Sequence, residues 1–71
     1  MEKRPFDVLE QAKGKRVMIR LKNGEELVGT LKAFDMHLNI WLDDAERHEE
    51  QRKVRLGTVV LRGDNILLIS P

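Results

Sequence analysis

The chain has no cysteine, no tyrosine, only two prolines and no long apolar run. Without cysteine it forms neither disulfides nor thiolate metal sites. Its longest apolar segment, Ile66 to Ile69, is far too short to span a membrane, and its first residues are too charged for a signal peptide, so we expect a cytoplasmic location. Thirteen Lys and Arg against twelve Asp and Glu give a formal net charge of +1, which excludes a bulk polycation that binds nucleic acid non-specifically.

The length of 71 residues suffices for a single domain, which we place at residues 1–71. A chain of this size buries only about 60% of its unfolded surface and commonly needs a disulfide, a metal or a subunit interface. His48 lies among glutamates, but a solvated surface is the simpler interpretation of that charged segment, so we expect no metal site and no cofactor. Oligomerisation is therefore the expected source of added stability.

A short helical pattern followed by alternating strands is what the sequence does contain. Pro5 suits a first helical turn, and Lys13 with Gly14 suits a helix end, which predicts a helix at 4–14. Alternation of apolar and polar residues then predicts five strands, with Asn23-Gly24 as a hairpin turn. The predicted strands cover residues 17–21, 26–35, 38–43, 54–61 and 66–69.

Glycines inside two of the strands, Gly29 and Gly57, indicate sharp bending. We therefore predict a mainly β fold, with a short N-terminal helix on a five-stranded, strongly bent antiparallel barrel. The charged segment 44–53 is either a solvated hairpin tip or two strand ends that project into water. The last strand, 66–69, is apolar on both faces, and we expect its edge to be open and to pair with a neighbouring subunit. Such a head-to-tail contact closes into a ring if the rotation permits, with a size that the pattern leaves open.

Candidate functional residues lie at two short turns. The first turn holds Asp35, His37 and Asn39, and the second runs from Arg62 to Asn65. If the barrel curls as predicted, both turns lie on one rim. Imidazole and guanidinium planes can stack on an unpaired base, and an Asn amide offers a donor and an acceptor to the base edge.

Uracil is the base that this group of residues would suit. A uracil edge presents an acceptor beside a donor, which a fixed Asn39 could bind, whereas cytosine presents the wrong order. Asp35 and Asp64 would orient the residues that contact the base, and Gly63 would let the backbone approach closely. Each residue alone is explained equally well by ordinary turn chemistry, so the prediction depends on their combination.

Two motifs in order make the chain similar to the Sm-like (LSm) family. The first motif is matched by Ile19-Arg20-Leu21-Lys22-Asn23-Gly24, Leu27, Gly29, Leu31, Phe34-Asp35, His37, Asn39 and Leu42. The second is matched by Leu56-Gly57 and by Val59-Val60-Leu61-Arg62-Gly63-Asp64-Asn65-Ile66. The motifs cover about 17–43 and 54–70, with the variable charged hairpin 44–53 between them. Arg-Gly-Asp-Asn in the second motif resembles the archaeal Sm-like proteins rather than the bacterial branch.

The resemblance implies a homo-oligomeric ring, usually a heptamer, joined by pairing of the fourth and fifth strands. It implies single-stranded U-rich RNA as the partner, with one uridine per subunit at the inner rim, and a role in RNA processing beside other RNA-processing proteins. By motif position, His37 and Arg62 would sandwich the base and Asn39 would bind its edge. The remaining residues that the resemblance places at this RNA-binding pocket are Asp35, Met36, Gly63 and Asp64.

Other residues have plainer explanations. Trp41 and Phe34 sit inside predicted strands, so burial or interface packing is favoured over base stacking. Lys3 and Arg4 could touch RNA on a second surface, but ordinary solvation is favoured. No nucleophile motif, phosphate loop or metal-ligand spacing accompanies the two turns, so we predict no enzyme. The rival hypothesis is a ring-shaped protein-interaction scaffold in a ribonucleoprotein, with little direct RNA contact.

Overall fold

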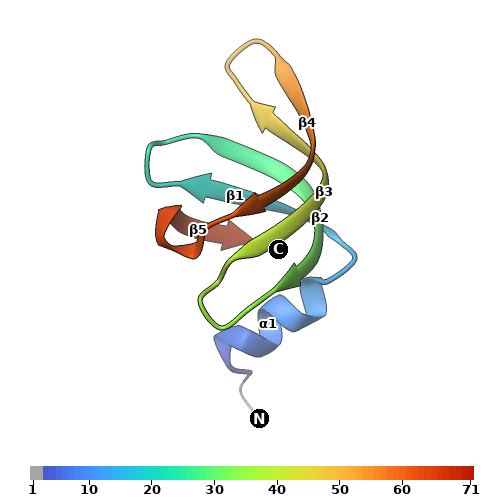
Figure 1. Ribbon diagram of the computed structural model, residues 1–71, viewed down its shortest axis with the longest axis vertical. Helices are drawn as coiled ribbons and strands as arrows, with labels where there is room; N and C mark the ends of the chain where they lie inside the picture. The colour runs from blue at the N-terminus through green and yellow to red at the C-terminus, as the bar shows by residue number, and fades with distance from the viewer. Residues whose placement is uncertain (1–2) are drawn as a thin grey trace.

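The computed structural model describes residues 3–71 as one helix and five antiparallel strands (Figure 1). The elements are α1 Pro5–Ala12, β1 Arg16–Leu21, β2 Glu26–Phe34, β3 Ile40–His48, β4 Lys53–Leu61 and β5 Ile66–Ser70, with a 3-10 turn at Gly63–Asn65. The strands form one sheet in the order β4-β3-β2-β1-β5. The mainly β fold is thereby confirmed. Within residues 3–71, no helix has both the length and the apolar character needed to cross a membrane.

Helix α1 packs at one end of the bent sheet. Pro5 lies in its first turn as predicted, and the Asp7 carboxylate accepts a hydrogen bond from the Arg4 backbone N–H at 3.0 Å. The Phe6 ring meets the Phe34 ring of β2 edge to face, with centroids 5.1 Å apart. Because a helix this short is unstable alone in water, this packing is what holds it in place.

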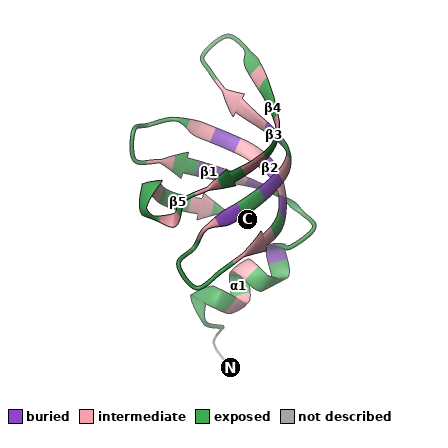
Figure 2. Ribbon diagram, in the orientation of Figure 1, coloured by how far each residue is buried: buried purple, intermediate pink, exposed green. Residues whose placement is uncertain are grey.

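The core is built from the inward face of the alternating strands (Figure 2). The buried side chains are Val17, Ile19, Leu27, Leu31, Ile40, Leu42 and Ala45, together with Ala12 of the helix. None of the described residues is a buried polar or charged one. The polar chemistry of residues 3–71 therefore lies on the surface and in the turns.

The sheet bends at Gly29, where β2 lies close to β3. A Cβ atom on Gly29 would lie 3.1 Å from the Cβ of Leu42 and 3.2 Å from the Cα of Ala45, so the missing side chain permits this approach. The pairing of β2 with β3 shifts register at the same place, between Val28 and Thr30. The prediction that Gly29 marks a curled sheet is confirmed.

The third strand differs from its predicted bounds at both ends. Leu38 was expected to begin it, but this residue lies in the preceding turn with φ +59° and an exposed side chain. The turn is held by hydrogen bonds to Asp35, and β3 starts only at Ile40. At the other end β3 continues to His48 and β4 starts at Lys53, so the charged segment is two projecting strand ends rather than a long solvated tip.

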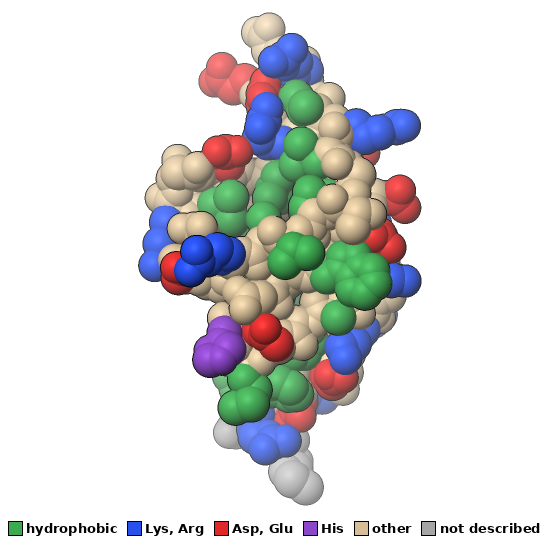
Figure 3. Space-filling model, viewed as in Figure 1, with side chains coloured by type: hydrophobic (Ala, Val, Ile, Leu, Met, Phe, Trp, Pro, Cys, Tyr) green, Lys and Arg blue, Asp and Glu red, His purple; other side chains and the backbone are tan. Residues whose placement is uncertain are grey.

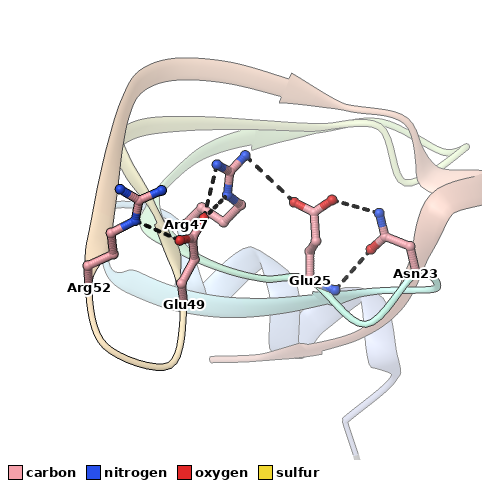
Figure 4. A network of polar contacts seen from close by, with 5 residues as sticks. All are labelled: Asn23, Glu25, Arg47, Glu49 and Arg52. Carbon is pink, nitrogen blue, oxygen red and sulfur yellow. Dashed lines mark hydrogen bonds and ion pairs between the residues drawn. The ribbon is translucent and has the colours of Figure 1, made fainter.

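Polar contacts tie the projecting β3–β4 hairpin to the β1–β2 turn (Figure 4). Nη1 of Arg47 lies 3.9 Å from Oε2 of Glu25, whose Oε1 accepts a hydrogen bond from Nδ2 of Asn23 at 2.7 Å. Nη2 of Arg47 lies 3.1 Å from Oε2 of Glu49, which also accepts a hydrogen bond from Nε of Arg52 at 2.8 Å through Oε1. These contacts stabilise the end of the molecule opposite the helix.

Strands β4 and β5 are the two edges of the sheet. Four of the exposed large apolar side chains lie on them: Leu56, Val60, Leu67 and Leu68. Figure 3 shows hydrophobic side chains gathered in the middle of one face, with charged side chains around them. Exposed apolar edges promote aggregation unless they are paired or covered. The open edge predicted for the last strand is confirmed, and β4 supplies a second one.

Candidate nucleic-acid interface

The β2–β3 turn and the β4–β5 turn are in direct contact at one rim of the barrel. The backbone N–H of Gly63 donates a hydrogen bond to Oδ1 of Asn39 at 3.0 Å. A Cβ atom on Gly63 would collide with the carbonyl oxygen of His37 and lie 2.9 Å from the carbonyl carbon of Leu38. Only glycine fits this close approach. The prediction that the two turns share a rim is confirmed.

Asp35 organises the first turn. Its Oδ1 accepts hydrogen bonds from the backbone N–H of His37 at 2.9 Å and of Asn39 at 3.0 Å, and its Oδ2 accepts one from Nδ2 of Asn39 at 3.0 Å. The bond from the Asn39 side chain, followed by the bond from its backbone, lowers the pKa of the Asp35 carboxyl below its ordinary value of 3.8. The ionised carboxylate thus holds Asn39 in the way that the sequence predicts for a supporting residue.

The two partners of the Asn39 amide fix which way it faces. Gly63 offers a backbone N–H, which only the amide oxygen can accept, and the Asp35 carboxylate requires a donor, which only Nδ2 can supply. In this way Nδ2 uses one of its two N–H donors, and Oδ1 uses one of its two lone pairs. One Nδ2 proton and one Oδ1 lone pair remain for a ligand, in a fixed order.

An open pocket of about 570 Å³ lies over the contact between the turns. Its lining residues are His37, Asn39, Arg62, Gly63 and Asp64. His37 and Arg62 come from different turns and are both exposed. Nη2 of Arg62 lies 3.5 Å from Oδ2 of Asp64, an exposed pair that restrains the guanidinium only weakly. The pocket therefore offers two planar side chains and one fixed amide to a planar ligand.

Several residues singled out in the sequence do not line this pocket, including Asp35, which contacts Asn39 instead. Met36 is 90% exposed in the first turn and does not line it. Phe34 packs against Phe6, as expected of a strand residue. Trp41 stays 43% exposed on β3, where its Nε1 donates a hydrogen bond to Oδ1 of Asp43 at 3.0 Å.

Two groups that shape the pocket have no recognisable sequence signal. The backbone N–H of Gly63 is one, because a main-chain donor is present at nearly every residue and its direction depends on the fold. The positive φ of Leu38 is the other, because leucine seldom adopts that conformation and nothing in its neighbourhood predicts it. Gly63, in contrast, could be recognised from the sequence, which predicted a close approach of the backbone at this position.

The other charged residues singled out in the sequence do not line this pocket. His48 lies at the end of β3, with its ring nitrogens 3.7 Å from Glu26 and 3.4 Å from Glu46. In the part of the chain that is described, no group of three or more His, Cys, Asp or Glu is arranged to hold a metal ion. Lys3 donates a hydrogen bond to Gln11, and Arg4 pairs with Asp7, so both cations contact the helix itself.

A small, strongly bent antiparallel barrel with a polar pocket where two turns meet defines an Sm-type β-barrel protein. The chain belongs to the LSM domain family, whose family model matches residues 7–71. The resemblance found in the two motifs is thereby confirmed over nearly the whole chain.

Similar proteins share both sequence and fold with this chain. An Sm-like protein of Methanosarcina barkeri is 44% identical, with both chains aligned over 100% of their length. The Sm protein of Pyrococcus abyssi, solved in complex with a uridine heptamer, is 46% identical with a TM-score of 0.91, over 97% of this chain and 99% of that one. The SmAP1 heptamer of P. aerophilum is 37% identical with a TM-score of 0.93, over 100% of this chain and 96% of that one.

Proposed function

We propose that copies of this chain assemble into a closed ring that binds single-stranded U-rich RNA, with one uridine held in the pocket of each subunit. His37 and Arg62 stack on the two faces of the base, and Asn39 binds its edge. Asp35 orients Asn39, Asp64 restrains Arg62, and Gly63 supplies the close approach of the second turn. Met36 contacts RNA from outside the pocket.

The observation that carries this proposal is the fixed amide of Asn39. Its free Nδ2 proton and free Oδ1 lone pair are complementary to O4 and N3–H of uracil. Cytosine presents a donor and an acceptor in the reverse order at the same two positions. In a pocket where the base enters between two flanking side chains, this order discriminates uracil from cytosine.

Assembly into a ring accounts for binding by a nearly neutral chain. Pairing of the β4 edge of one copy with the β5 edge of the next is a head-to-tail contact, which closes when the rotation permits. Two relatives of this chain are heptamers, and we propose the same number of subunits here. One Arg62 and one His37 per copy then surround a common opening, where several copies together focus a positive potential.

The test is binding of U-rich and C-rich oligoribonucleotides of equal length across a salt series. We expect clear preference for the U-rich oligomer at every salt concentration, because base-edge contacts do not depend on screening. Equal affinities would contradict the role assigned to Asn39. A closed ring that binds neither oligomer would favour the protein-interaction scaffold instead.

The cellular part of the proposal is a role in RNA processing in the cytoplasm. Purification of the protein from its host with its bound RNA, followed by sequencing of that RNA, tests the role. Cell fractionation tests the location. We propose no catalytic step, and turnover of labelled RNA with divalent metal that is abolished in His37→Ala would contradict this.

A further inference from the structure

An apolar groove runs between helix α1 and strand β5, the strand that forms one edge of the sheet. Its volume is about 360 Å³. The residues that matter most to it are Val8 and Leu9 of the helix, Leu67 and Leu68 of β5, and Leu38 and Gly63 of the two turns. Val8, Leu67 and Leu68 are exposed although they are apolar. A groove of this kind on a small domain needs something to cover it.

On the opposite side of the sheet, Val60 of the edge strand β4 and Trp41 of the adjoining strand β3 form an exposed apolar pair, here called the protrusion. The two residues are register partners on β3 and β4, with 43% and 71% of their surface exposed. Nε1 of Trp41 and Oγ1 of Thr58 each donate a hydrogen bond at 3.0 Å to Oδ1 of Asp43. The indole is thus held in one orientation while its apolar faces remain free.

We propose, on the basis of the ring described above, that Trp41 and Val60 of one copy fill the groove of the next copy. Antiparallel pairing of β4 with the neighbouring β5 sets those strands about 4.8 Å apart, so Val60 on β4 comes within one strand spacing of the strand that carries Leu67 and Leu68. Protrusion and groove lie on different edges of the chain, as a head-to-tail contact requires. The occupant of the groove is therefore a second copy of this chain.

Trp41 then stands between two RNA pockets. Within its own copy it lines a small cavity of about 240 Å³ together with Asp35 and Asn39. The groove that receives it in the next copy is backed by Leu38 and Gly63, whose backbone forms the contact between the two turns. Trp41 is thus a positioning residue that supports the Asn39 side of one pocket and the Gly63 side of the next.

The surroundings of Trp41 favour a protein neighbour over a nucleic acid. The cavity beside it is lined mainly by apolar residues, among them Ala33, Ile40 and Val60, and its lining includes no Lys or Arg. Its one ionised lining residue is Asp35, which repels phosphate. A stacking platform for single-stranded RNA normally stands beside cations that contact the backbone.

The experiment uses Trp41 as its own reporter, because the chain has one tryptophan and no tyrosine. Acrylamide quenching of the tryptophan fluorescence is measured without RNA across a dilution series, with native mass spectrometry giving the number of subunits. We expect the quenching constant to fall several-fold as rings form. Val8→Asp in the groove should raise the protomer concentration needed for assembly about tenfold or more, since truncated or charged contact centres have large effects.

Val8→Ile is the matched control, because it keeps the groove apolar at the same exposed helix position. It should assemble and shield Trp41 as the unchanged chain does. Asp at position 8 is compatible with the first turn of a helix, so loss of folding is not expected, and circular dichroism checks this.

If the chain assembles, three results would overturn the proposal. The first is a ring in which Trp41 remains fully open to acrylamide, and the second is assembly of Val8→Asp at the same protomer concentration as the unchanged chain. The third is an open Trp41 whose emission is quenched only by oligouridine, which would make it a base platform. Absence of any oligomer overturns both this inference and the proposed ring. Shielding of Trp41 in a ring that binds no U-rich RNA would leave the inference standing and remove the proposed RNA function.

Discussion

Arg62 is an exposed member of the proposed base-contacting groups, with 78% of its side chain open to solvent. Arg62→Ala should weaken binding of oligouridine by about 1–3 kcal/mol per stacked base, because a base–side-chain stack is lost. Fluorescence anisotropy with a labelled oligouridine measures the change. Arg62→Lys is the matched control, since it keeps the charge and removes the plane. Binding by Arg62→Lys as tight as by the unchanged chain would contradict stacking.

Gly63 determines how closely the two turns approach each other. Gly63→Ala should lower the free energy of unfolding by about 1–3 kcal/mol, because the added methyl group collides with the His37 carbonyl and forces the backbone to shift. Urea unfolding at constant protein concentration measures the loss. Asp64→Ala, an exposed side chain in the same turn, should change stability little. Equal effects of both substitutions would show that the contact between the turns is not close.

The Asp35 carboxylate should make the stability of the rim depend on acid. Hydrogen bonds from Asn39 lower its pKa below 3.8 on folding, so its contribution is present above that value and is lost as pH falls through the lowered pKa. The difference in unfolding free energy between the unchanged chain and Asp35→Ala should be constant from neutral pH to about 4 and then shrink. A difference that persists unchanged in stronger acid would refute this. Urea unfolding across a pH series provides the measurement.

At the residue scale, the sequence predicted which side chains meet at the pocket better than it predicted the backbone conformation of the turns. Asp35, Asn39 and Gly63 were selected because their side chains, or the lack of one, suit a pocket, and the structure brings them within hydrogen-bond distance. The conformation of Leu38 escaped prediction, since leucine seldom adopts a positive φ and its side chain gives no sign of one.

At the scale of elements, strand ends were harder to predict than strands. The alternation that identifies a half-buried strand is interrupted in β3 after Leu42, where Asp43 and Asp44 precede the buried Ala45 and the pairing with β4 shifts register. Beyond Leu42 the pairing of β3 with β4 is set by the partner strand, from Ala45↔Gly57 to His48↔Lys53. A charged sequence such as 44–53 therefore gives no period to count, although its residues 44–48 belong to β3.

Arg47 tests how much the polar contacts contribute to the projecting hairpin. Arg47→Ala should lower the free energy of unfolding by about 0.2–1 kcal/mol, because its pairs with Glu25 and Glu49 are partly exposed. The loss should become smaller in concentrated salt, where such pairs are screened. Lys32→Ala removes a positive charge from an exposed site on β2 and serves as the control. Two variants with the same salt dependence would indicate an effect of net charge alone.

At the scale of the whole molecule, the net charge of +1 is too small for bulk electrostatic attraction of RNA to dominate. Binding would then depend on contacts that are repeated in each subunit. If pockets around a ring hold successive uridines, affinity should rise steeply with oligouridine length up to the number of subunits and then level off. Titration with oligouridines of increasing length measures this, and native mass spectrometry gives the subunit number independently. Affinity that does not change with length would mean that the pockets act separately or that only one is used.

The hydrogen bond between Asn39 and Gly63 limits how the base preference of this protein can change during evolution or by design. The same amide that would select the base also fastens one turn to the other, so selectivity and folding share one functional group. Asn39→Asp, for example, replaces the amide with two acceptor oxygens, which removes both the donor proposed for O4 of uracil and the donor to Asp35 and sets two carboxylates against each other. A new base preference therefore requires coordinated changes at positions 35 and 39. A substitution at one of these positions alone is expected to weaken both the contact between the turns and the binding of a base.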